Sequence, residues 1–200
     1  MVVLAVLALV FGVLVGTFDV QNFLLDALVS NKDLVLYLLM FSVGMSIGLH
    51  KGIIKKIKEY HVKILIIPAG IIVGTLLGGV LLSIVTKYNV GESTSVVSGL
   101  GWYSLAGVTI GNLAGAHLGS IAFLSNLMRE IFSFFTIPFI AKHFNYYSCI
   151  APAAATSEDT TLPMMMKYTN EETVVLSVIN GVLCSAVVPV LIPLCYQLKF

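Results

Sequence analysis

A short polar stripe interrupts the apolar stretch between residues 119 and 141. The positions i, i+3, i+4 and i+7 are occupied by Asn126, Arg129, Glu130 and Ser133. Residues at these spacings share one face of an α-helix. The guanidinium of Arg129 offers up to five donors, and the carboxylate of Glu130 accepts from cations. Because a charge at the bilayer centre costs about 2.5–3.5 kcal/mol, this face should point to the protein interior or to water.

A second polar group lies among the residues that run from Thr156 to Pro163. Glu158 and Asp159 are flanked there by the hydroxyls of Thr156, Ser157, Thr160 and Thr161. Proline removes a backbone donor and opens a helix upstream of itself, and hydroxyls can satisfy the freed groups. The pattern predicts a broken helix within the membrane, where carboxylates and freed carbonyls bind cations.

Two structural alternatives compete with this interpretation. The segment around Glu158 and Asp159 could be a solvated turn outside the membrane, although its flanks are apolar. The charges on the stripe could form a purely structural ion pair between Arg129 and Asp159. Buried ion pairs are costly to desolvate and stabilise a fold weakly. This favours a functional role for these charges over a structural one.

A third candidate is the run Trp102-Tyr103-Ser104, which opens a segment rich in Gly and Ser. Aromatic residues are common anchors at membrane interfaces. They could instead line a site, because an aromatic face attracts a desolvated ammonium by up to about 2 kcal/mol.

The composition places all these residues in a membrane protein. Of 200 residues, 58% are hydrophobic and only 10% are charged, and the mean hydropathy is +1.00. Soluble domains carry about 25% charged residues. The formal net charge of +1 argues against a nucleic-acid partner. Neither a catalytic nor a zinc motif is present, so we expect no enzyme and no metal site.

Seven stretches approach the roughly 20 apolar residues that a membrane span needs. They cover about residues 1–18, 34–50, 62–86, 95–115, 119–141, 149–169 and 173–196. The sequence therefore predicts an all-α membrane protein, a polytopic bundle of about seven transmembrane helices with one broken between Thr156 and Pro163. The absence of a linker predicts a single transporter domain over residues 1–200. Five lysines in the loop 51–63 predict that this loop is cytoplasmic.

Glycines recur every fourth residue in three places. The three series are Gly44, Gly48 and Gly52; Gly70, Gly74 and Gly78; and Gly107, Gly111, Gly115 and Gly119. Small residues on one helical face let helices approach closely in lipid. We predict tight helix packing there, with a sliding surface beside a substrate path as the alternative.

Read in order, three motifs resemble the lysine exporter family of bacterial inner membranes. They are Gly-Leu-Gly-Trp-Tyr-Ser-Leu from Gly99, Asn-Leu-Met-Arg-Glu from Asn126, and Thr-Ser-Glu-Asp-Thr-Thr-Leu-Pro from Thr156. The stretch 36–52 also resembles the family, and the likeness extends over nearly the whole chain. The chain resembles the C-terminal two-thirds of full-length members. By analogy of fold, the resemblance implies a transporter built from inverted repeats.

The resemblance implies efflux of L-lysine, and of lysine analogues, across the bacterial inner membrane by a multi-pass protein. Coupling to a proton or sodium gradient is expected, with no cofactor. Asp159 matches the family's intramembrane aspartate, and the stripe of Asn126, Arg129 and Glu130 matches its second polar cluster. Glu158 stands where a relative has an apolar residue. Because full-length members carry further N-terminal spans, the resemblance also predicts a separate partner subunit or a homodimer.

The hypothesis is a cation-coupled exporter of lysine in which Asp159 binds the substrate ammonium or the coupling ion. Arg129 would bind the substrate carboxylate, or neutralise Glu130 or Asp159 in the empty site. The predicted substrate site consists of Asp159, Glu158, Arg129, Glu130, Asn126, Trp102, Tyr103, Ser104, Thr156, Ser157 and Thr160. The rivals are the same fold with another amino acid or a small ion, and a non-transporting membrane subunit. A channel is a weaker option, because no ring of pore carbonyls is evident.

Overall fold

The computed structural model describes residues 63–198 continuously, and of residues 1–62 only isolated positions. The chain divides into two compact units, Met1–Val43 and Gly44–Phe200. All helices described below belong to the second unit. The predicted segment 34–50 and the basic loop 51–63 fall almost entirely outside the described residues, and segment 1–18 is described only at scattered positions. The single-domain assignment stays a prediction.

The described residues form helices joined by short turns, without a strand, which confirms the all-α fold class. In chain order the elements are α5 (Lys63–Val85), α6 (Val90–Val97), α7 (Tyr103–Ala114), α8 (Ala116–His143), the 3₁₀ turn η1 (Tyr147–Cys149), α9 (Ile150–Ala153), the 3₁₀ segment η2 (Ala154–Glu158), α10 (Leu162–Tyr168) and α11 (Glu171–Tyr196).

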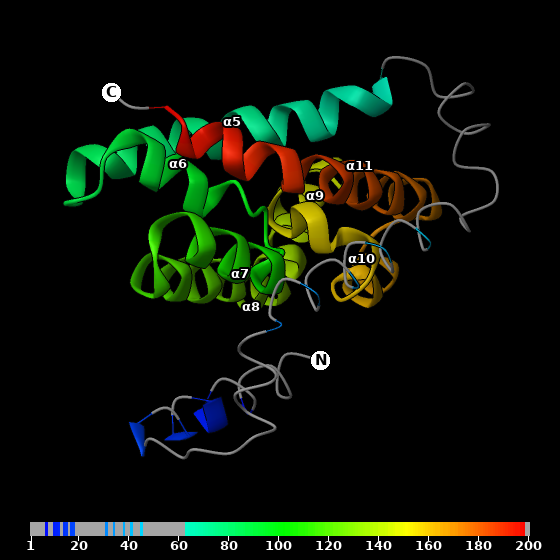
Figure 1. Ribbon diagram of the computed structural model, residues 1–200. Coiled ribbons are helices and arrows are strands. Elements are labelled where there is room, and N and C mark those ends of the chain that lie inside the picture. Colours follow the sequence, from blue (N-terminus) through cyan, green and yellow to red (C-terminus); the bar gives the residue numbers. More distant parts are fainter. Residues whose placement is uncertain are drawn as a thin grey trace. The chain divides into compact units, whose positions relative to one another are not determined.

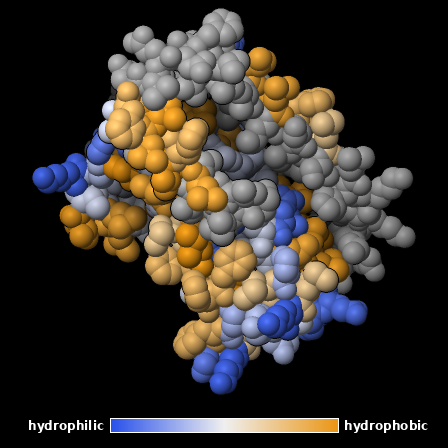
Figure 2. Space-filling model, turned by 90° about the horizontal axis from the view of Figure 1, so that it is seen from below, coloured by the Kyte–Doolittle hydropathy of each residue, from blue (hydrophilic) through white to orange (hydrophobic). Residues whose placement is uncertain are grey.

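In the part of the chain that the structure describes, three helices are long and apolar enough to cross a membrane. They cover Ile64–Val85, Ala116–His143 and Glu171–Tyr196, and they correspond to three of the seven predicted spans. Large apolar side chains on them remain exposed, as Leu77, Phe135 and Val190 show. Figure 2 shows broad apolar areas on one face of the molecule. Such exposure is unfavourable in water and is expected of helices that face lipid.

Two other predicted spans are broken, so the structure does not reproduce seven continuous spans. The stretch 95–115 divides into α6 and α7, because Leu100 and Gly101 adopt the left-handed conformation with φ of 51° and 97°. The stretch 149–169 divides where Ala154 has φ of 49°. It divides again between Glu158 and Leu162, where Pro163 stands in the first turn of α10. The break predicted in this region is therefore confirmed.

The second unit has two layers of helices (Figure 1). Helices α5, α6 and α11 pack together in one layer, α7 and α8 pair in the other, and α9 with η2 lies between them. The chain passes from one layer to the other at the break between α6 and α7. Leu100 and Ala154, the residues with positive φ at the two breaks, are both fully buried.

The three glycine series differ in how closely they pack against neighbouring helices. Gly115 has φ of 91° and makes the turn between α7 and α8, so its series does not form one helical face. Gly111 and Gly119 instead face each other across this hairpin, because a Cβ on Gly119 would lie 2.7 Å from the Gly111 Cα. Along α5, no described atom lies within 4 Å of a Cβ built on Gly70, Gly74 or Gly78, so tight packing is not seen there. The series from Gly44 to Gly52 lies outside the described residues.

Candidate substrate site at two helix breaks

The side chain of Asn126 on α8 spans the break between α6 and α7. In a continuous helix the Gly101 N–H would bond to a carbonyl four residues earlier. It donates instead to the Asn126 Oδ1 at 2.8 Å, while the Asn126 Nδ2 donates to the Val96 carbonyl at 2.9 Å. Gly99 makes this approach possible, since a Cβ there would lie 2.7 Å from the Nδ2. The amide thus satisfies backbone groups on both sides of the break.

Arg129 likewise bonds to free backbone groups, at the break between α9 and η2. The usual donor to the Ala151 carbonyl would be the Ala155 N–H, but this group donates to the Leu100 carbonyl at 3.0 Å. Arg129 replaces it, donating to the carbonyls of Ala151 at 3.1 Å and Pro152 at 3.2 Å. The bond between Ala155 and Leu100 joins the two breaks directly.

The guanidinium does not meet the carboxylates as the sequence suggested. Its third bond goes to the Thr75 hydroxyl on α5 at 3.2 Å, and none of the three reaches Glu130 or Asp159. The structural ion pair between Arg129 and Asp159 is therefore not formed among the described residues. The reason is that the helix break leaves carbonyl oxygens without donors close to α8, and these must be satisfied.

Helix α11 holds η2 by a reciprocal pair of serines. Ser157 donates to the Ser177 carbonyl and Ser177 to the Ser157 carbonyl, both at 2.7 Å. Asn180 donates to the Ala154 carbonyl at 2.9 Å. Gly181 leaves room for Glu158, since a Cβ there would lie 2.6 Å from the Glu158 Cβ. Ser157, predicted as a substrate ligand, thus has a structural role, and so has Thr156, whose hydroxyl donates to the Ala153 carbonyl.

Three carboxyl groups gather beside the breaks. Glu130 is 1% exposed, and neither of its oxygens has a hydrogen-bond partner among the described residues. Glu158 accepts from the Ser185 hydroxyl at 2.9 Å. Asp159 is exposed and accepts from the backbone N–H and the hydroxyl of Thr160. Electrostatic repulsion links Asp159 to both glutamates, so the cluster is suited to a cationic group.

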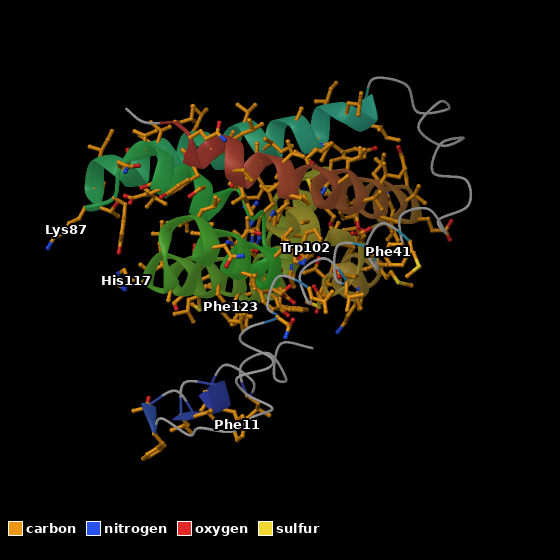
Figure 3. All side chains as sticks on the ribbon, in the orientation of Figure 1. Phe11, Phe41, Lys87, Trp102, His117 and Phe123 are labelled. Atoms are coloured by element: carbon orange, nitrogen blue, oxygen red, sulfur yellow. The ribbon has the colours of Figure 1, made fainter. Side chains whose placement is uncertain are left out.

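Of the aromatic candidates, Tyr103 is the one that belongs to this cluster. It lies within electrostatic range of Glu130 and Asp159, and its ring packs edge-on against Phe123 with 5.3 Å between centroids. Trp102 precedes α7 directly at the break, half-buried, as is Ser104. Figure 3 shows Trp102 in the middle of the second unit, whereas Lys87 and His117 lie at one end.

Sequence reasoning missed the polar face of α11. Ser177, Asn180 and Ser185 are buried and contact η2. A signal was present, because these residues follow one another at i, i+3 and i+8, on one face of an apolar helix. His117, for which the sequence indicated no role, pairs with the Tyr88 hydroxyl at 3.1 Å.

A cavity of about 300 Å³ is lined in part by Arg129. Its lining comes from α5, α6 and α8 and consists of Thr75, Gly78, Leu82, Val97, Ser125, Asn126 and Arg129. Arg129 is the charged member of this lining. The described residues contain no group of three His, Cys, Asp or Glu side chains placed to hold a metal ion.

Apolar spanning helices together with a polar site at two joined breaks define an integral membrane protein of the transporter class. The chain belongs to the lysine exporter family. The family's sequence profile, described as "Lysine exporter LysO", matches residues 6–196. This membership confirms the family that the motifs indicated, and a transporter family in place of an enzyme.

Two curated relatives agree with this assignment. The chain is 28% identical over 161 residues to "Lysine exporter LysO" of Escherichia coli K12, an alignment that covers 80% of this chain and 53% of that protein. It is 32% identical over 158 residues to the "Putative lysine exporter" of Haemophilus influenzae, covering 79% of this chain and 80% of that protein. The chain therefore spans about half the length of the E. coli relative. No solved structure matches it.

Proposed function

We propose that this protein exports L-lysine from the cytoplasm across the bacterial inner membrane, driven by an inward proton or sodium gradient. The observation that carries the proposal is the carboxyl cluster of Glu130, Glu158 and Asp159 at the joined breaks. Glu130 is buried without a hydrogen-bond partner among the described residues, while Asp159 is exposed at the surface of the second unit. An ammonium group or a coupling ion would supply the missing positive charge, and the two would compete for the same carboxylates.

The breaks also support an alternating-access mechanism. Discontinuous helices that meet at a site near the bilayer midplane are characteristic of transporters with inverted repeats. We propose that α6–α7 and the segment from η1 to α10 form such a pair, within a bundle of seven membrane-embedded segments. Ala155 and Leu100, which join the breaks, would then move together.

Counterflow of labelled L-lysine in proteoliposomes tests the function. We expect Asp159→Asn and Glu130→Gln each to reduce counterflow at least tenfold while thermal unfolding in detergent stays close to that of the wild type. Each change keeps the side chain's size and removes the charge. Glu171→Gln, an exposed substitution in the first turn of α11, is the matched control and should retain counterflow.

The rivals predict different results in the same liposomes. Competition by other amino acids but not by lysine would assign another substrate to the fold. A non-transporting subunit would show no counterflow, and lysine would not protect cysteines placed near Asp159 from alkylation. Full counterflow by the purified monomeric chain would contradict the predicted partner subunit or homodimer.

A further inference from the structure

Arg129 carries a positive charge that the described residues do not neutralise. Its three hydrogen bonds end on two carbonyls and a hydroxyl, all of which are uncharged. Since a guanidinium has five N–H donors, two remain for which the described residues supply no acceptor. A half-buried charge without a counterion is costly, so an anion at this position would be strongly favoured.

The cavity beside Arg129 offers room for that anion. Its volume of about 300 Å³ lies at the lower end of the range of about 300–1,000 Å³ for small-molecule sites. The hydroxyls of Thr75 and Ser125 and the amide of Asn126 line it together with the guanidinium. Among the described residues no carboxylate lines the cavity, so the described lining would not repel an anion.

The position of the cavity relates it to the carboxyl cluster. Arg129 and Glu130 are adjacent on α8, and the buried Cys184 lies within electrostatic range of both the Arg129 guanidinium and the Glu158 carboxyl. The cation-attracting carboxyl cluster and the anion-attracting guanidinium therefore lie close to each other. This arrangement fits a zwitterionic solute better than a simple amine.

We propose that the cavity between α5 and α8 is a carboxylate subsite, in which Arg129 and Thr75 bind the carboxylate of the amino acid. The inference rests on the proposed function and deepens it, because it makes the exporter selective for amino acids over the corresponding amines. Guanidinium groups hold carboxylates through two parallel hydrogen bonds, and the two remaining donors of Arg129 allow such a pair.

The test measures how well L-lysine, L-lysinamide and pentane-1,5-diamine inhibit counterflow of labelled L-lysine in phosphatidylcholine liposomes. The last two compounds lack the carboxylate but keep the amines. For the wild type we expect the half-inhibitory concentrations of both to be about tenfold or more above that of lysine, because charged hydrogen bonds are lost. In Arg129→Gln the ratio of each amine's half-inhibitory concentration to that of lysine should fall toward one.

A pair of glycine variants keeps the test independent of the structural role of Arg129. Gly78 lines the cavity, Gly74 does not, and both have open space at Cβ. Gly78→Leu should fill the cavity. It should reduce the ratio of the half-inhibitory concentration of the diamine to that of lysine at least fivefold, whereas Gly74→Leu should leave this ratio unchanged.

Three outcomes would decide against the subsite, and a fourth would refute the proposed function. A wild-type ratio near one, with lysine counterflow intact, would refute it and leave the proposed function standing. An unchanged ratio in Gly78→Leu would do the same. If added phosphatidylglycerol weakens lysine inhibition in the wild type but not in Gly78→Leu, the cavity binds a lipid phosphate instead. Absence of lysine counterflow in the wild type would refute the proposed function itself.

Discussion

Asn126 shows how one side chain can replace part of a helix. It is 2% exposed, and its amide bonds to the Gly101 N–H and to the carbonyls of Val96 and Ala122. The sequence placed it on a polar stripe with Arg129 and Glu130 and predicted that all three would contact substrate. The structure separates their roles, because two of the three satisfy backbone groups and Glu130 alone remains without a partner among the described residues.

Removing this amide should destabilise the protein. Asn126→Ala leaves the Gly101 N–H and the Val96 carbonyl buried without their partner, and each such group costs about 1–3 kcal/mol. We therefore expect a loss of about 2–6 kcal/mol in the free energy of unfolding, measured by denaturant titration in detergent. Ser120→Ala removes an exposed hydroxyl bond on the same helix and should change stability by less than about 0.5 kcal/mol. Equal effects of the two substitutions would contradict the bridging role.

The stripe on α8 and the motif at Gly99 could be recognised from sequence, but their contact could not. Asn126 and Gly101 are 25 residues apart. Helical periodicity shows which residues share a face and does not show what that face meets. The polar face of α11 was visible by the same rule, yet its partner η2 is irregular and has no period from which to predict it.

At the level of helices, the hairpin of α7 and α8 depends on two glycines. Gly111 and Gly119 meet across it, and a methyl group on Gly119 would lie 2.7 Å from the Gly111 Cα and 2.8 Å from the Gly107 carbonyl. Both neighbours are backbone atoms and cannot rotate away. The helices would have to separate.

Gly119→Ala should therefore destabilise the hairpin by about 1–3 kcal/mol, the usual cost of overpacking. Gly70→Ala is the matched control, because it lies within α5 with open space at Cβ and alanine favours helix by about 1 kcal/mol. Thermal unfolding of the two purified variants in detergent compares them. A Gly119→Ala protein as stable as Gly70→Ala would show that the hairpin is not closely packed.

At the scale of the molecule, the described residues carry large apolar side chains on the outside and polar groups at the breaks inside. On α8, Phe135 is 71% exposed while Ile137, two residues further, is fully buried. In an aqueous protein this arrangement would expose a large aromatic ring to water. In a membrane it places the ring among acyl chains.

A nitroxide spin label distinguishes these environments in liposomes. A label on Phe135→Cys should be relaxed strongly by oxygen, which concentrates in lipid, and weakly by a water-soluble nickel chelate. A label on Ile137→Cys should respond weakly to both. The native Cys149, Cys184 and Cys195 are buried, which limits background labelling. Stronger relaxation of the first label by nickel than by oxygen would contradict a lipid-facing α8.

Composition and hydropathy alone determined that this chain is a helical membrane protein, and its motifs determined the family. Both follow from local properties, because a span needs only length and apolarity and each motif is a run of neighbouring residues. Tertiary structure decided the rest. It divided the stretch 95–115 at Leu100, turned Arg129 toward carbonyl oxygens, and left Glu130 without a partner among the described residues. Those outcomes depend on which backbone groups a break leaves unbonded, and on which side chains, distant in sequence, lie close enough to bond to them.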